Sequence, residues 1–188
     1  QQMTLCTSAL ARLRSRASTT TNRQLIGEWL ESFGEQWRLR HPHVKFERLG
    51  VPPADVSLDD TVAVSQILTI LLDNAARASR DHVTLSCALA ARGDQIVFEV
   101  CDAGPGIPAP LRGSLGTMPV DSTQGGHGVG LYLAFSAAAR LGGSIELTDV
   151  SPIKPRGTRA VLRLPLAGRK LAGAGRQGAA PSNTEKQA

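Results

Sequence analysis

The sequence has few cysteines, few aromatic residues and no long apolar run, and each shortage excludes a class of protein. The three cysteines, Cys6, Cys87 and Cys101, fit no zinc-binding spacing, and their odd number argues against a disulfide scaffold. A reducing, cytoplasmic setting is therefore expected. No run approaches the roughly 18 apolar residues of a membrane span, and residues 1–4 lack the basic start of a signal peptide. Aromatic residues make up 4% of the chain, so an aliphatic core is expected.

Basic residues are also scarce where a nucleic-acid-binding protein would need them. The net charge of +5 arises at the ends, because residues 1–24 carry +4 and residues 168–188 carry +3, which leaves −2 for residues 25–167. A nucleic-acid-binding core concentrates positive charge on its own folded face. The charge pattern therefore argues against a nucleic-acid partner.

The chain does contain the helix and strand signals of one domain. Apolar spacing predicts helices over 3–17, 24–39, 61–79 and about 128–141, and strands over 44–49, 82–91, 95–102, 144–149 and 158–166. Residues 18–22 are expected to be a linker, and residues 103–127, rich in glycine and proline, a long loop. This order predicts an α+β fold, a two-layer sandwich with helices on one face of a mixed sheet.

The longest apolar helix carries one amide, Asn74, at the edge of its apolar stripe, about 70° from the centre. The amide either bonds to a neighbouring loop or supplies a neutral oxygen to Mg²⁺, which takes a few protein oxygens together with phosphates. Arg77, one turn later, is either a solvated surface residue or a phosphate contact. The buried stripe is expected to contain Val64, Leu68, Leu71, Ala75 and Ala78.

Two glycine motifs follow this helix. Residues 102–106 read Asp-Ala-Gly-Pro-Gly at the end of a strand, which predicts either an ordinary turn or a carboxylate that accepts a hydrogen bond from an exocyclic amine such as that of adenine. Residues 125–131 read Gly-Gly-His-Gly-Val-Gly-Leu before a helix, which predicts either a flexible loop or a phosphate cradle at the helix N-terminus. No Lys-Ser/Thr pair follows, so this is not a Walker A loop.

In combination these motifs resemble the GHKL (Bergerat-fold) ATP-binding superfamily. The combination is a helical asparagine, an Asp-x-Gly-x-Gly motif beginning 28 residues later, the second glycine motif, and a Gly-Thr pair at 157–158 before the last strand. Over residues 24–167 the chain looks most like the catalytic ATP-binding domain of sensor histidine kinases. Segments 28–40, 74–79 and 141–143 look similar to the RegB/PrrB group of redox-responsive kinases.

The resemblance implies ATP and Mg²⁺ as cofactors and a role for each matching residue. Asn74 corresponds to the Mg²⁺-coordinating asparagine, Arg77 to a basic phosphate contact and Asp102 to the adenine-binding aspartate. Residues 107–127 would form a mobile ATP lid, in which His127 either is exposed or contacts phosphate. The other implied ATP-binding residues are Gly104, Gly106, Gly126, Gly128, Gly130, Leu131 and Thr158.

Three departures from the family pattern bear on activity. Related ATPases of the gyrase, MutL and Hsp90 kind have a water-activating glutamate four residues before the asparagine, and this chain has Ile70 there. Slow hydrolysis is therefore expected, which favours phosphoryl transfer. Pro119 replaces the usual lid phenylalanine, and Thr123 stands where the redox group commonly has lysine.

The phosphoacceptor histidine that the family needs on a dimerisation helix has no match here. His41, His43, His82 and His127 lack its His-Glu/Asp-x-x-x-Pro-like context, and His41 is expected to be a surface residue of a loop. Residues 1–20 would be a remnant of the second dimerisation helix, residues 21–167 the catalytic ATP-binding domain, and residues 168–188 a disordered tail. No catalytic residue is therefore assigned within the chain.

The resemblance also implies partners and leaves rivals open. The parent kinase would be a homodimer anchored in the bacterial inner membrane, with a dimerisation domain that takes the phosphate and a response regulator receiver domain that receives it next. The rivals are an anti-sigma-factor-type serine kinase, a degenerate nucleotide-sensing module and a true ATPase. Cys6 either packs in a helix pair or has a redox role, whereas Cys87 and Cys101 are expected in the core.

Overall fold

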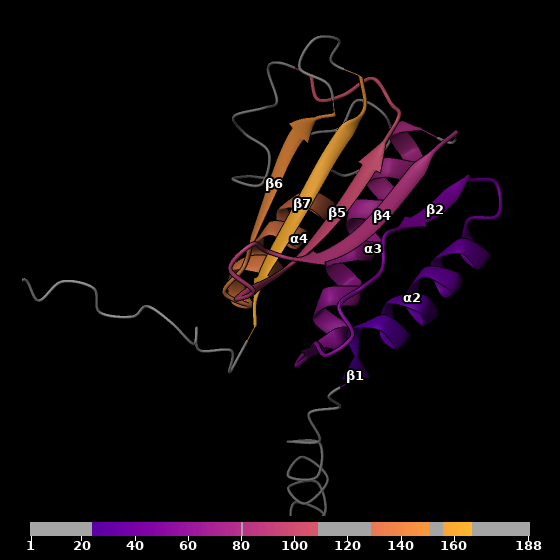
Figure 1. Cartoon of the computed structure of the whole chain (residues 1–188). Helices are drawn as coiled ribbons and strands as arrows, with labels where there is room; N and C mark the ends of the chain where they lie inside the picture. Colours follow the sequence, from indigo (N-terminus) through magenta and orange to yellow (C-terminus); the bar gives the residue numbers. More distant parts are fainter. Residues whose placement is uncertain (1–23, 80, 109–128, 151–155, 167–188) are drawn as a thin grey trace, which may run out of the picture.

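A five-stranded mixed sheet forms one layer of the molecule (Figure 1). The computed structural model describes residues 24–79, 81–108, 129–150 and 156–166. The strand order is β2-β4-β5-β7-β6, and only the β2–β4 pair is parallel among these described strands. The strands are β2 (Phe46–Leu49), β4 (Val83–Leu89), β5 (Gln95–Asp102), β6 (Ser144–Asp149) and β7 (Thr158–Pro165).

Three helices, α2 (Ile26–Arg40), α3 (Thr61–Ala78) and α4 (Val129–Arg140), form the second layer on one side of the sheet (Figure 1). Burial alternates along β5, so that Ile96, Phe98, Val100 and Asp102 share the buried side. Phe98 meets Trp29 of α2 with their ring centroids 6.0 Å apart, so the buried side is the helical side. The predicted two-layer α+β fold is therefore confirmed, and Asp102 lies at the end of a core-facing row.

An N-terminal cap and a buried apolar face stabilise helix α3. The Asp60 carboxylate accepts from the Ala63 N–H at 2.9 Å, and the N–H of Ser79 bonds back to the Ala75 carbonyl at the other end. Ala78 is exposed, so the predicted stripe ends one turn earlier, because the helix runs past the edge of the core. The buried residues of α3 are Val64, Ile67, Leu68, Leu71, Leu72, Ala75 and Ala76.

The sequence did not predict the first strand pair. Strand β1 (Gln24–Leu25) pairs antiparallel with β3 (Ser57–Leu58), so α2 begins two residues later than predicted. Strands of two residues are too short to show an alternating pattern. The predicted helix over 3–17, most of the long loop and the tail from 168 lie outside the described residues. Within the described part, no helix combines the length and apolar character needed to cross a bilayer.

The two cysteines of the sheet lie on opposite faces. Cys87 pairs with Phe98 and is buried in the core, where desolvation raises the pKa of its thiol to about 12. Cys101 belongs to the other face and is only half-buried, so its predicted place in the core is wrong. Strand alternation puts an odd-numbered residue of β5 on the side away from the helices. Burial and the carboxylate of Glu99 raise the Cys101 pKa to about 11.

Candidate functional site

An apolar cavity of about 190 Å³ opens between α3 and the ends of the central strands. Its polar groups are few, namely Asn74 of α3, Asp102 of β5 and Thr158 of β7. A mostly apolar cavity with a few convergent polar groups is typical of a small-molecule site, and roughly 300–1,000 Å³ encloses a whole drug-sized ligand. The described walls therefore suit part of a ligand, such as a base. They are completed by Leu71, Ala75, Ala78, Val100, Gly106, Ile107, Pro108, Leu131, Leu147 and Ala160.

Asp102 is the buried charge of this cavity, with 8% of its surface exposed. Its Oδ1 accepts from the Gly104 N–H at 2.7 Å and from the Thr158 N–H at 3.1 Å. Burial raises the pKa of the carboxyl above its ordinary value, and the hydrogen bonds from Gly104 and Thr158 only partly oppose this effect. Two amide donors fix the orientation of the carboxylate, and its remaining lone pairs can accept from a ligand.

Two glycines allow the backbone to close around Asp102. A Cβ on Gly104 would lie 2.8 Å from the Asp102 Oδ1 and 2.9 Å from both the Cβ and the carbonyl oxygen of Ala78. Gly157 has φ +76° and donates its N–H to the Gly104 carbonyl at 2.7 Å. Gly157 was noted in the sequence only as the neighbour of Thr158, yet it joins the start of β7 to the Asp102 turn.

The turn after Asp102 is fixed from β6 as well. Gly106 has φ +83°, which an L side chain rarely adopts, so this glycine is required by the backbone. The next N–H, that of Ile107, lies 3.3 Å from the Asp149 Oδ1 at the end of β6. Asp149 was not predicted, because an aspartate at a strand end has no distinctive sequence signal.

Asn74 lies in the last turns of α3 and lines the same cavity as Asp102. Its Oδ1 accepts from Arg77 Nη2 at 2.8 Å. Its Nδ2 is buried and has no hydrogen-bond partner among the described residues. A buried unpaired donor costs about 1–3 kcal/mol, so a ligand or water that accepts from it would stabilise the site.

The site offers Mg²⁺ one neutral oxygen, that of Asn74. No group of three or more histidine, cysteine or acidic side chains within the described ranges is arranged to hold a metal ion. Mg²⁺ usually keeps waters and phosphate oxygens and takes only one or two protein ligands. The donor set therefore suits an ion that arrives with a phosphate ligand and does not suit a structural metal.

The structure brings most of the predicted site residues together. Asn74, Asp102, Gly106, Leu131 and Thr158 line the cavity. Gly104 donates its backbone N–H to Asp102. Gly130 lies close to Ile70, because a Cβ on this glycine would be 3.5 Å from the Ile70 Cγ2. Arg77 is exposed and bonds to its own helix. Gly126, His127 and Gly128 lie outside the described residues, as does the predicted lid up to residue 127 apart from Ile107 and Pro108.

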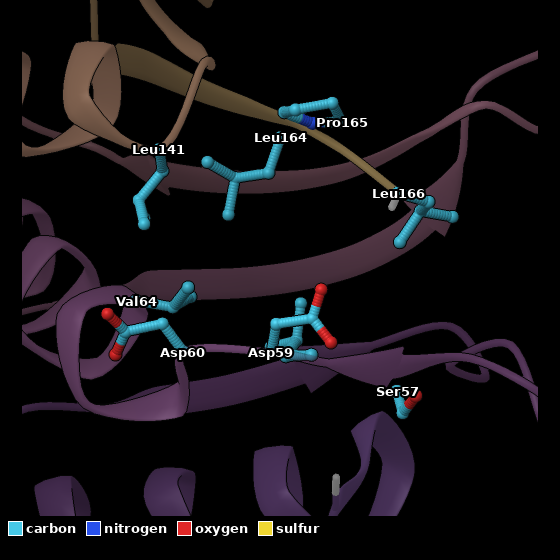
Figure 2. Close-up of a pocket in the computed structure, with 9 residues that line it drawn as sticks. Ser57, Asp59, Asp60, Val64, Leu141, Leu164, Pro165 and Leu166 are labelled. Atoms are coloured by element: carbon cyan, nitrogen blue, oxygen red, sulfur yellow. The ribbon is translucent and has the colours of Figure 1, made fainter. Parts of the chain in front are cut away.

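A second cavity, of about 240 Å³, lies at the other end of α3 (Figure 2). Its charged residues are Asp59 and Asp60, and Asp60 caps the helix. No lysine or arginine belongs to its described lining, so carboxylates would repel a phosphate there. Its apolar walls are Leu58, Val64, Leu141, Leu164 and Leu166. The acidic second cavity is therefore a poor place for the phosphates of a ligand.

Fold and site together define a nucleotide-binding domain of the GHKL type. The chain belongs to the family of histidine kinase-, DNA gyrase B- and HSP90-like ATPases, whose model matches residues 59–168. The family includes ATPases, so the match supports ATP as the ligand of the cavity.

The relatives narrow the kind of protein further. Nitrogen regulation protein NtrY of Azorhizobium caulinodans is 34% identical in an alignment of 136 residues, and the match covers 69% of this chain and 17% of that protein. Sensor histidine kinase DpiB of Escherichia coli K12 is 37% identical in an alignment of 100 residues, and the match covers 50% of this chain and 18% of that protein. The chain thus spans less than a fifth of the length of these curated relatives.

A solved structure agrees with these relatives. The mycobacterial sensor histidine kinase MprB has 25% sequence identity and a TM-score of 0.64, over 76% of this chain and 95% of that chain. The predicted resemblance to the ATP-binding domain of sensor histidine kinases is confirmed by these matches. The narrower likeness to the RegB/PrrB group stays a prediction.

Proposed function

We propose that this chain binds Mg·ATP and presents the γ-phosphate to a histidine on a dimerisation domain outside the chain. The observation that carries the proposal is the convergence of Asn74 and Asp102 on one apolar cavity. Asp102 can then accept from an amine and Asn74 can bind a cation, and both line a cavity that suits a nucleotide base.

Each described residue has a distinct task in this proposal. Asp102, held by the Gly104 and Thr158 N–H groups, accepts from the exocyclic amine of adenine. Leu71, Val100 and Ala160 exclude water from the base. Asn74 turns its oxygen toward the cation, and the exposed Arg77 moves from Asn74 to a phosphate oxygen. Mg²⁺, when bound, neutralises charge on the phosphates.

The surroundings of Ile70 favour transfer over hydrolysis. This side chain occupies the position of the water-activating glutamate and faces Gly130 at the start of α4. An aliphatic group cannot take a proton from water. The γ-phosphate is therefore expected to survive until an acceptor side chain approaches it, which favours a kinase over a true ATPase.

The partners are part of the proposal. Exposed Val129, Tyr132 and Leu133 place apolar surface on α4 beside the cavity residue Leu131, and this surface suits a dimerisation domain that brings its histidine to the nucleotide. Residues 21–167 would act as the ATP-binding domain, with residues 1–20 as a remnant of the dimerisation helix and 168–188 as a tail. A receiver domain of a response regulator would then accept the phosphate. This transfer would take place in the cytoplasm, with the parent kinase anchored in the inner membrane.

Calorimetric titration with the non-hydrolysable analogue AMPPNP tests the binding site through Asn74. Wild-type protein should bind more tightly with Mg²⁺ than without it. Asn74→Ala should lose that enhancement, about tenfold or more, because the cation loses its protein ligand, while Mg²⁺-free affinity changes little. Equal magnesium enhancement in both proteins would contradict the metal assignment. Phosphorylation of an added dimerisation domain then tests the transfer.

The raised pKa of Asp102 predicts a pH dependence of binding. The ionised carboxylate is a stronger acceptor for the adenine amine than the protonated group, in which one oxygen becomes a donor, and burial favours the protonated form. Affinity should therefore fall as the pH drops through the Asp102 pKa, at a higher pH than for a solvent-exposed aspartate. Adenosine, which has no phosphates that titrate, is the ligand to use in an NMR titration in which the pH is lowered stepwise from neutrality. Constant affinity over that range would oppose the assignment.

A further inference from the structure

An aromatic and carboxylate cluster joins the end of α2 to the turn of α3 that precedes Asn74. Trp37 is fully buried, and its indole Nε1 donates to the Asp73 Oδ1 at 2.8 Å. The His41 ring stacks on the Trp37 indole with centroids 4.1 Å apart, and its Nε2 lies 3.4 Å from the same Oδ1. The histidine predicted to be a surface residue is thus half-buried against the core, with 23% of its side chain exposed.

Contacts with the end of α2 and with β2 hold the cluster in place. His41 Nδ1 lies 3.0 Å from the Trp37 carbonyl oxygen, and the His41 backbone N–H bonds to the Arg38 carbonyl at the end of α2. The Phe46 ring of β2 also packs against Trp37, at a centroid distance of 5.1 Å. Asp73 therefore meets a donor whose position is set by helix, strand and stacking together.

From Asp73 the contacts continue to the candidate Mg²⁺ ligand. Arg77 Nε lies 3.3 Å from the Asp73 carbonyl oxygen, while Nη2 of the same guanidinium donates to Asn74 Oδ1. The Asn74 Nδ2 has no partner within the described part of the chain, so the amide itself is held only through Arg77 and the helix backbone. The direction of Asn74 thus depends on how this turn of α3 is rotated.

We propose that Trp37, His41 and Asp73 are positioning residues for Asn74, acting by fixing the rotation of α3 at the nucleotide site. Consecutive helical residues project about 100° apart, so a turn with Asp73 held toward α2 directs Asn74 toward the cavity. A side-chain atom lies roughly 5–6 Å from the helix axis, and a rotation of about 10° therefore moves it by ~1 Å. Mg²⁺ requires near-octahedral geometry at about 2.0–2.1 Å, so it is sensitive to such a shift.

The proposal rests on the proposed function, since it concerns the cation ligand of that site. Its measure is the magnesium enhancement, defined as the AMPPNP Kd without Mg²⁺ divided by the Kd with Mg²⁺. Asp73→Ala and Trp37→Phe should lower the enhancement about tenfold, with the Mg²⁺-free Kd changed less than about twofold. Asp73→Asn keeps an oxygen acceptor for the indole and should retain most of the enhancement.

Trp29→Phe is the matched control, because it removes the same atoms from the same helix and core. Trp29 lies eight residues before Trp37, about 12 Å along the helix, and packs on Phe33 and Phe98. It should leave the enhancement unchanged. In an Asn74→Ala background, Trp37→Phe should have no further effect on the enhancement. A loss that is equal with and without Mg²⁺, or equal in both tryptophan variants, would overturn the proposal.

A second measurement needs no ligand and separates this proposal from the proposed function. Backbone hydrogen exchange over residues 73–77 should be about tenfold faster in Trp37→Phe, and unchanged relative to the rest of α3 in Trp29→Phe. Unchanged local exchange in Trp37→Phe would overturn the positioning role. If wild-type protein binds no nucleotide while exchange responds as stated, the proposed function fails and the link between α2 and α3 remains.

Discussion

Asp102→Ala should bind AMPPNP at least about 100-fold more weakly than the wild-type protein. The substitution removes the carboxylate that would accept from adenine, and a hydrogen bond to a charged group contributes about 1.5–3 kcal/mol. It also leaves the Gly104 and Thr158 N–H groups without their acceptor, so the turn loses its shape. Since about 1.4 kcal/mol corresponds to a factor of ten, the two effects together give the stated loss.

The fold should tolerate this change better than the site does. Burial already disfavours the ionised Asp102, as its raised pKa indicates, so its removal relieves a charge held in an apolar place. Asp102→Asn keeps an acceptor for the two amides but presents an NH₂ group to the ligand amine, and it should bind as poorly as alanine. Glu99→Gln, on the other face of the same strand, should bind like wild type. Tight binding by Asp102→Asn would contradict recognition of an exocyclic amine.

Gly157→Ala should destabilise the folded protein by about 2–5 kcal/mol and abolish nucleotide binding. The residue has φ +76°, and this left-handed conformation costs an L residue about 1–2 kcal/mol. Its Cβ would also lie within 2.2 Å of the Asp102 carbonyl oxygen, and relieving such a clash typically costs about 1–3 kcal/mol more. The movement would pull Thr158 from Asp102. Urea unfolding measures the first effect and AMPPNP titration the second.

Gly93→Ala isolates the backbone part of this cost. Gly93 has φ +70° in the β4–β5 turn, and a Cβ there meets nothing within 4 Å. It should cost only about 1–2 kcal/mol and leave binding intact. If the two alanine variants were equally stable, the close approach of Gly157 to the Asp102 strand would not be limiting.

The polar part of the site could be predicted from sequence, because its residue types are informative. An amide at the edge of an apolar helix and an aspartate before two glycines both require a structural explanation, and the combination with Gly157 and Thr158 is restrictive. The sequence placed Asp102 only at the end of a strand, and its core-facing position emerges from the alternating burial along β5 in the structure. The predicted bounds of β5, β6 and α3 agree with the structure to within one residue.

The rest depends on contacts between segments far apart in the chain. Trp37 and Asp73 are 36 residues apart, and nothing in either segment indicates that an indole would meet that carboxylate. The apolar walls consist of ordinary core residues such as Val100 and Ala160, which have no signal that separates a cavity from a packed interior. The exposure of Ala78 was missed because a helical pattern shows the apolar face and not where the core beneath it ends.

The hydrogen bond between Thr158 and Asp102 also determines when the site can exist during synthesis. The two residues are 56 positions apart, and the Gly157 N–H closes the same gap onto Gly104. Pairing across such a separation loses the entropy of loop closure before any contact stabilises the pair. The pair therefore forms late in folding. A chain still emerging from the ribosome therefore gains its nucleotide pocket only after β7 has been made and has docked. Until then Asp102 is an ordinary carboxylate at the end of an unfinished sheet.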